Sequence, residues 1–372
     1  METIGSRLNQ YKGIGPGFDF LRISLACSVV AWHVNAIVTG DLSYNETPIL
    51  WMVGYFILAS FFGLSGFLIA GSALRLSLSN FLINRGLRIV PALAVEIVLS
   101  ALILGPIFTT LALGEYFSNI GTWQYFTNII GWVNYVLPGV FKDHRTDIVN
   151  NTLWTVPHEI GCYVIMSGLI LFGLLKRPWL LPIAAGIIIM LSLILPNYGI
   201  GPESKGVERV LYILFVGKAS RLYVCFILGI FAFLMKDKIP YSWGIFGLCV
   251  IYCFLIGLFP QQGGVNYPLM NLLLPLPMIY ITAFLGVTDI WVPKFLRSGD
   301  YSYGIYLYGW PLQQVLVAVL PENTSLFVHF LLVIPFITLF AAFSWHFIER
   351  PILKIRKKFS FVARVRLDAN AG

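Results

Sequence analysis

Charged residues are scarce in this chain of 372 residues. They make up 11% of it, whereas 58% of the residues are hydrophobic, and the mean hydropathy is +0.81. A soluble domain carries roughly a quarter charged residues. The shortage of charge and the apolar excess therefore exclude an ordinary soluble enzyme, a disordered protein and a small scaffold held by disulfides.

Sequence motifs for metals and nucleotides are also missing. The five cysteines all lie in apolar stretches, none of them forms a CxxC pair, and no histidine–cysteine cluster has zinc spacing. Walker, GxGxxG and haem motifs do not occur. We therefore expect no metal and interpret the cysteines as small packing residues.

Long apolar blocks dominate the chain instead. Several are longer than about 18 residues and do not alternate polar with apolar positions, which favours membrane-spanning helices over strands. The sequence predicts an all-α, polytopic transmembrane helical bundle of about ten spans. These are expected near residues 18–40, 48–72, 88–112, 153–175, 179–196, 220–235, 241–259, 268–287, 301–320 and 326–348. The block 121–140 is broken by Asn128, Asn134, Pro138 and Gly139, which indicates an interfacial or re-entrant segment.

Basic residues define the expected orientation, because lysine and arginine stay on the cytoplasmic side of short loops. With a cytoplasmic N-terminus, most of the 25 lysines and arginines lie on that side, and an even number of spans returns the C-terminus to it. We expect a multi-pass protein of the cytoplasmic membrane whose first span is an uncleaved signal anchor. The net charge of +8 then reflects topology and a basic tail near anionic lipid, and no nucleic-acid binding is expected. The expected organisation is a cytoplasmic segment (1–17), a transmembrane domain (18–351) and a basic cytoplasmic tail (352–372).

Ionisable side chains in the first span are candidates for function, because such groups are costly inside a membrane. Arg22 and His33 are eleven residues apart, close to three helical turns, so they share one face about 16 Å apart. Asp19 lies one turn before Arg22, where an ion pair forms easily. The face supplies a charged inner end and a titratable imidazole, although a lone histidine in a helix is usually a packing residue.

The predicted cytoplasmic loop after the second span carries a group of arginines. Arg85 and Arg88 form an R-x-x-R pair one turn apart, and Arg75 precedes them. Guanidinium groups bind phosphate bidentately, so these residues suit a phosphate-bearing ligand, or they serve only as positive-inside anchors. Ser65, among small residues of the second span, allows a close approach either of another helix or of a ligand.

Two carboxylates remain. Glu159 follows Trp154 and His158 at the expected outer mouth of the fourth span, where it either orients His33 or only snorkels to the interface. Glu96 is an intramembrane carboxylate to which the sequence assigns no role, and an arginine is one candidate partner.

Taken together, five ordered segments resemble the membrane-bound acyltransferase family three, from about residue 17 to 351. They are FDFLRISLACSVVAWH, FFGLSGFLI, NRGLRIVPAL, NTLWTVPHEIGCY and the pair GDYSYGIYLYGWPLQQ and FIERPI. Two positions depart from the family pattern. His158 stands where an apolar or aromatic residue is common, and Tyr308-Gly309-Trp310 replaces a version that frequently contains histidine.

The resemblance implies an integral membrane enzyme, an acyltransferase for groups other than aminoacyl groups. Its most common reaction is O-acetyl transfer from acetyl-CoA to a hydroxyl of a surface or lipid-linked carbohydrate. On this reading His33 and Glu159 are catalytic, and Asp19, Arg22 and Ser65 support them. Acetyl-CoA is bound through Arg85, Arg88 and Arg75, and the acceptor through Trp154 and His158.

A different class of protein also accounts for intramembrane charges. In a proton-coupled transporter or flippase of a glycan or small metabolite, Arg22, His33 and Glu159 would form the pathway. That reading does not account for the R-x-x-R pair and the membrane histidine in this motif order. An inactive scaffold is the third alternative.

Overall fold

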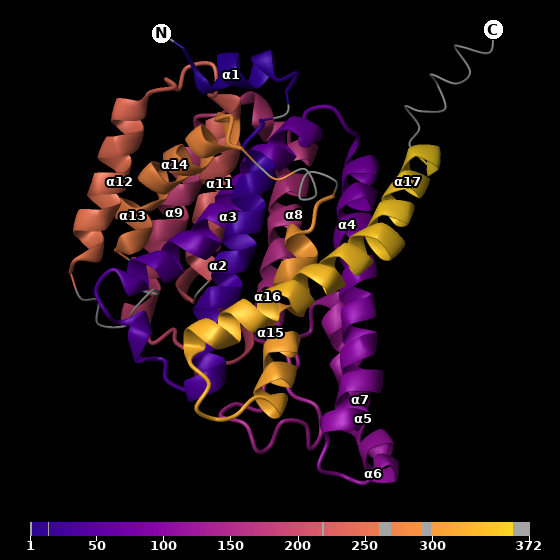
Figure 1. Ribbon diagram of the computed structural model, residues 1–372. Helices are drawn as coiled ribbons and strands as arrows, with labels where there is room; N and C mark the ends of the chain where they lie inside the picture. The colour runs from indigo at the N-terminus through magenta and orange to yellow at the C-terminus, as the bar shows by residue number, and fades with distance from the viewer. Residues whose placement is uncertain are drawn as a thin grey trace, which may run out of the picture. The chain divides into compact units, whose positions relative to one another are not determined.

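The computed structural model describes residues 2–13, 15–217, 219–259, 269–291, 293 and 299–359. The described residues are mainly helical (Figure 1), and the only β-structure among them is two isolated bridges, Thr3–Pro240 and Thr109–Val140. The end of the predicted tail, residues 360–372, lies outside the described residues. The all-α class expected from the sequence is confirmed.

The chain forms two compact units, and the helices α2 and α8 each contribute to both. The first unit comprises residues 1–25, 42–76 and 164–292. Its helices are α1 (Ile4–Gln10), the start of α2 (Phe18–Thr39), α3 (Leu50–Ala73), the end of α8 (Val156–Leu171), α9 (Leu180–Ile194), α10 (Gly206–Leu211), α11 (Ala219–Leu234), α12 (Trp243–Gly257), α13 (Met270–Leu273) and α14 (Pro275–Val287).

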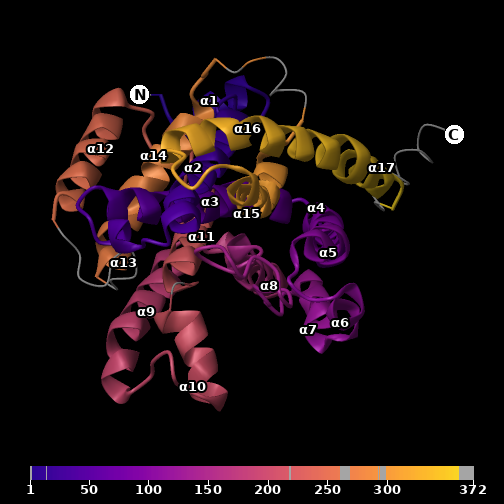
Figure 2. The ribbon, with the colours of Figure 1, turned by 60° about the horizontal axis from the view of Figure 1, so that its bottom comes forward.

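The second unit comprises residues 26–41, 77–163 and 293–372. Besides its parts of α2 and α8, its helices are α4 (Leu78–Leu99), α5 (Gly105–Phe108), α6 (Leu113–Ser118), α7 (Ile120–Gln124), α15 (Ser302–Val319), α16 (Leu326–Phe343) and α17 (Arg350–Phe359). Two π-helical turns, η2 (Ser100–Leu104) and η10 (Ser344–Glu349), continue α4 into α5 and α16 into α17. In Figures 1 and 2, α15 and α16 lie side by side.

Five helical stretches among the described residues are long and apolar enough to cross a membrane, or six if the bent α10–α11 pair is one span. The shorter helices α12 and α14 are also apolar. Each of the ten blocks expected to span the membrane contains a helix, and the block 121–140 is broken as expected. The start of the third span was wrong, because Ser77 caps α4 through Asn80 N, 3.4 Å from its hydroxyl, so that the helix begins at Leu78. Arg85 and Arg88 therefore lie within a helix and not in a loop.

The first unit is built on close contact between α3 and α11. A Cβ atom on Gly66 would lie 2.1 Å from the carbonyl oxygen of Phe226, and one on Gly229 would lie 2.1 Å from that of Gly63. Only glycine allows two helix backbones to approach this closely. The small residues around Ser65 therefore serve helix packing.

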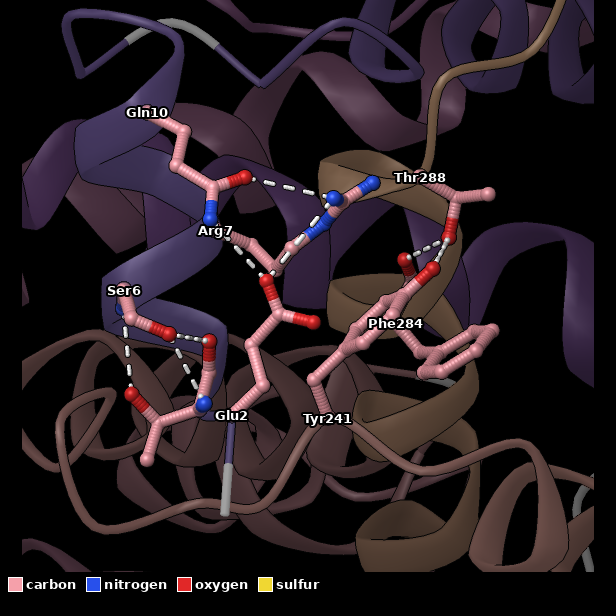
Figure 3. A network of polar contacts seen from close by, with 8 residues as sticks. Glu2, Ser6, Arg7, Gln10, Tyr241, Phe284 and Thr288 are labelled. Carbon is pink, nitrogen blue, oxygen red and sulfur yellow. Dashed lines mark hydrogen bonds and ion pairs between the residues drawn. The ribbon is translucent and has the colours of Figure 1, made fainter.

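The N-terminal helix α1 is fastened to the same unit by a polar network (Figure 3). Arg7 lies 3.8 Å from the Glu2 carboxylate and donates to Gln10, and its guanidinium covers the ring of Tyr241 at 4.9 Å. The Tyr241 hydroxyl lies 3.2 Å from Thr288 Oγ1, just after α14. These contacts hold the two ends of the unit's sequence together.

Candidate active site

The second unit contains a segment without α-helix that lies against α15 and ends in a 3-10 turn, η4 (Asn151–Thr155). This inserted segment, residues 144–155, has no α-helix and receives hydrogen bonds from α15. Gln314 Nε2 donates to the carbonyls of Thr146 (2.9 Å) and Ile148 (2.7 Å), and Trp310 Nε1 also donates to Ile148 O (2.8 Å). Such donors are required because backbone carbonyls away from water must be satisfied by protein groups.

His33 faces this arrangement from α2. Its imidazole meets the Trp310 ring edge-on, with centroids 4.9 Å apart and planes at 68°. Trp310 is 3% exposed and is fixed by its bond to Ile148, whereas His33 is half-buried. None of the described residues forms a hydrogen bond with His33. A positioned neutral imidazole of this kind can act as a general base or as a nucleophile.

Glu159 interacts with a different set of side chains. The Tyr163 hydroxyl donates to its Oε1 at 2.6 Å, and Arg85 and Arg88 are its nearby cations. Tyr303, which interacts electrostatically with Glu159, is seven residues before Trp310 on α15, or about 10 Å of helix. No hydrogen bond or ion pair joins Glu159 to His33 among the described residues, and the orientation of His33 by Glu159 stays a prediction.

Arg88 joins three elements of the second unit. Its guanidinium donates to Asp300 Oδ2 at 2.6 Å and to Glu349 Oε2 at 2.9 Å. Ser302 bonds to Asp300 (2.7 Å) and Ser344 bonds to Glu349 (3.1 Å), so each carboxylate has a further partner. Two carboxylates neutralise Arg88, which makes it a joint between α4, the start of α15 and η10. Sequence reasoning missed Asp300 as its partner, although Asp300 stands two residues before Ser302 of the S-Y motif.

Glu96 is held by an amide and not by an arginine. It is 1% exposed, and its Oε1 accepts hydrogen bonds from Ser100 Oγ (2.8 Å) and Asn150 Nδ2 (3.0 Å). Asn150 also donates to the carbonyl of Leu307 at 3.0 Å. Glu96 therefore anchors the inserted segment between α4 and α15. Asn150 was not singled out in the sequence, because its partners are 54 and 157 residues away.

The remaining predicted site residues divide between the two units. Trp154 and His158 form an edge-on ring pair at 5.6 Å in the second unit. The other four belong to the first unit: Asp19 and Arg22 lie on the first two turns of α2, Ser65 is half-buried on α3, and Arg75 is exposed just after α3.

Outside the spans, an aromatic segment follows α5. Tyr116 is buried and donates to the carbonyl of Ala101 at 2.7 Å, and burial raises the pKa of this phenol to about 12. Trp123 and Trp132 are largely exposed. In the part of the chain that the structure describes, no group of three or more histidine, cysteine, aspartate or glutamate residues is arranged to hold a metal.

Comparison with known proteins identifies the class. A family model described as an acyltransferase domain matches residues 16–346, so the chain belongs to this acyltransferase family and is a multi-pass membrane enzyme. It is 25% identical over 353 residues to the "O-acetyl transferase" of Shigella phage Sf6, covering 90% of this chain and 95% of that protein. It is 24% identical over 363 residues to the "Putative peptidoglycan O-acetyltransferase YrhL" of Bacillus subtilis (strain 168), covering 91% of this chain and 54% of that protein. No solved structure matches the chain.

Proposed function

We propose that this enzyme transfers an acetyl group from acetyl-CoA to a hydroxyl of a surface or lipid-linked carbohydrate. The names of the two relatives support O-acetyl transfer. The observation that carries the proposal is His33, an imidazole fixed against Trp310 with no hydrogen-bond partner among the described residues. The site lies in the cytoplasmic membrane with both chain termini in the cytoplasm, as the basic residues favour.

Two chemical routes use this imidazole. In direct transfer, His33 takes the proton of the acceptor hydroxyl while the acceptor oxygen attacks the thioester carbonyl. Coenzyme A then leaves as the thiolate. In the covalent route, an imidazole nitrogen attacks the thioester first, and the acceptor oxygen then displaces the imidazole from the acetyl group. Trapping of acetylated His33 in the absence of acceptor selects the second route.

The donor end of the site is assigned to Arg85 and Arg88. A guanidinium on α4 suits the phosphates of coenzyme A. Arg88 also binds two carboxylates, so it holds α4 to the start of α15 and to η10 as well. The other roles remain hypotheses from the sequence. On the donor side we assign Arg75, and as supporting residues Arg22 and Asp19. The acceptor side is assigned to Trp154 and His158.

Proteoliposomes containing the full chain test the function. They receive radiolabelled acetyl-CoA outside, where it meets molecules inserted with their cytoplasmic face outward, and they enclose a panel of cell-surface glycans. Acetylated glycan in the wild type, and none in the His33→Ala protein, is the expected result. Movement of glycan across the vesicle membrane without acetylation would instead establish the transporter alternative, and neither reaction would establish an inactive scaffold.

A further inference from the structure

Gln313 is a buried side chain of α15 that has no role in the site described above. It is 0% exposed, and its Nε2 donates to the carbonyl oxygen of Gly309 at 3.1 Å, one turn earlier on the same helix. A carbonyl oxygen only accepts hydrogen bonds, so this contact identifies the nitrogen end of the amide. The other end, Oε1, is buried and has no hydrogen-bond partner among the described residues.

A buried acceptor without a partner needs an explanation. Nearly all buried polar atoms in proteins are hydrogen-bonded, because removing such an atom from water without replacing its bonds is unfavourable. A leucine or methionine at this position would fill similar space without that cost. The oxygen of Gln313 therefore points to a donor that reaches it when the enzyme works.

The face of α15 that carries Gln313 is turned toward α2 within the second unit. A Cβ atom on Gly309 would lie 2.9 Å from Val30 Cγ2, so Gly309 packs directly against α2. Gln313 follows Gly309 by four residues, which keeps the two positions on one face about 6 Å apart along the axis. His33 follows Val30 by three residues, or about 4.5 Å.

The inserted segment shows that α2 and α15 run in the same direction. Arg145 lies beside the end of α2, because its Cβ would be 3.4 Å from a Cβ placed on Gly40. The next residue, Thr146, accepts a hydrogen bond from Gln314 on α15 at 2.9 Å. The later part of each helix therefore reaches the same part of the inserted segment.

Gln313 and His33 consequently lie at about the same level between the two helices. Each is about one turn beyond the contact of Gly309 with Val30. The ring contact of His33 with Trp310, three residues before Gln313, agrees with this register. His33 has no hydrogen bond with any residue that the structure describes, so an acceptor and a possible donor without partners occur at one level.

We propose that the Gln313 amide oxygen accepts a hydrogen bond from the imidazole N–H of His33 when the ring turns toward α15, which makes Gln313 a positioning residue. Catalytic hydrogen bonds often tighten only when substrate is bound. Holding the single N–H of a neutral imidazole fixes its tautomer and leaves the lone pair of the other nitrogen for the substrate. An amide oxygen has this role in the Cys-His-Asn proteases. The effect on acetyl transfer rests on the proposed function, whereas the hydrogen bond itself does not.

Nitrogen NMR of the imidazole rings tests the hydrogen bond directly. The full chain, isotope-labelled in its histidine rings and reconstituted in vesicles of phosphatidylethanolamine and phosphatidylglycerol, is measured with and without coenzyme A. The chain has five histidines, and the signals of His33 are those that disappear in His33→Ala. We expect one tautomer of His33 in the wild type, and both tautomers in Gln313→Met and in Gln313→Leu, which lack the amide oxygen.

Acetyl transfer gives a second measurement. Gln313→Met should lower kcat about 10–100-fold, as usually happens when the partner that orients a metal-bound histidine is removed. The Michaelis constant for acetyl-CoA should stay unchanged. Gln313→Glu keeps an acceptor oxygen and should recover most of the lost kcat. The matched control is Leu312→Met, which introduces the same side chain one residue away, on the face of α15 that lines an apolar cavity.

Equal tautomer populations of His33 in the wild type and in the variants without the amide oxygen, both with and without coenzyme A, would overturn the proposal. An equal effect of Leu312→Met would also overturn it. A wild-type protein in which Gln313 selects the tautomer of His33, but which acetylates no glycan, would refute the proposed function and leave the hydrogen bond standing. Wild-type kcat for glycan acetylation in Gln313→Met would refute the positioning role and leave the proposed function standing.

Discussion

Arg88 of α4 and Glu349 of η10 form an ion pair of 2.9 Å across 261 residues of sequence. Glu349 is 1% exposed and Arg88 also binds Asp300. Breaking a buried pair by removing one partner leaves an uncompensated charge, which costs about 3–5 kcal/mol. The pair therefore fixes η10 and the start of α15 to α4, and through α15 it supports the wall against which His33 lies.

The first prediction concerns this pair. Arg88→Met and Glu349→Leu should each lower the stability of the detergent-solubilised protein by about 3 kcal/mol, and the double variant should lose less than the sum, with a coupling of about 0.5–3 kcal/mol. Thermal unfolding followed by tryptophan fluorescence measures this cycle. Strict additivity would mean that the two residues do not act as a pair.

A second prediction separates catalysis by His33 from stability. His33→Ala should lower kcat by about 10²–10⁴-fold, the usual contribution of a general base. Its unfolding temperature should stay close to that of the wild type, because His33 gives up a ring contact and no hydrogen bond. Acetyl transfer assays and thermal unfolding of the same preparation check both parts, and near-normal turnover would remove His33 from the chemistry.

Trp310 provides a test of how the imidazole is positioned. Trp310→Phe keeps an aromatic ring beside His33 but deletes the donor to Ile148 O. We expect kcat to fall about tenfold, because a rise of roughly 1.4 kcal/mol in the activation free energy lowers a rate by a factor of ten. The Michaelis constant for acetyl-CoA should stay unchanged. Trp310→Ala should lower kcat much further than Trp310→Phe. Equal kcat values for the two variants would contradict a positioning role for the ring.

The arginine side of the site gives a fourth prediction. Arg85→Gln should raise the Michaelis constant for acetyl-CoA about tenfold or more, because a hydrogen bond to a charged group contributes about 1.5–3 kcal/mol. Glu159→Gln should leave kcat largely intact and lower that Michaelis constant, since it removes a negative charge near Arg85. A large fall in kcat with Glu159→Gln would instead favour the orientation of His33 by Glu159.

The contact between α3 and α11 gives a fifth prediction. Gly66→Ala places a Cβ 2.1 Å from a backbone carbonyl, so we expect a loss of about 1–3 kcal/mol from overpacking. Gly186→Ala on α9 is the matched control, because its Cβ would meet no atom within 4 Å and alanine favours helix. Equal unfolding temperatures for the two variants would show that α3 and α11 can separate without cost.

Much of the fold could be predicted from the sequence because the membrane leaves few choices. Apolar blocks of this length must form helices to satisfy their own backbone groups, and the motif order pointed to the acyltransferase family, which is confirmed. Helical periodicity also placed Arg22 and His33 on one face of the first span. These conclusions depend on local sequence, which determines which segments form helices and which residues share a helix face.

The tertiary structure alone decided which residues meet. Periodicity does not give the level at which one helix passes its neighbour, and α8 begins only after the inserted segment has run along α15. Glu159 accepts a hydrogen bond from Tyr163, Glu96 is bound by Asn150 rather than by arginine, and Arg88 is bound by Asp300 and Glu349. Tyr163 is one helical turn from Glu159, a local pair, but the partners of Glu96 and Arg88 come from segments distant in sequence, so packing of the whole unit, and no local pattern, selects them.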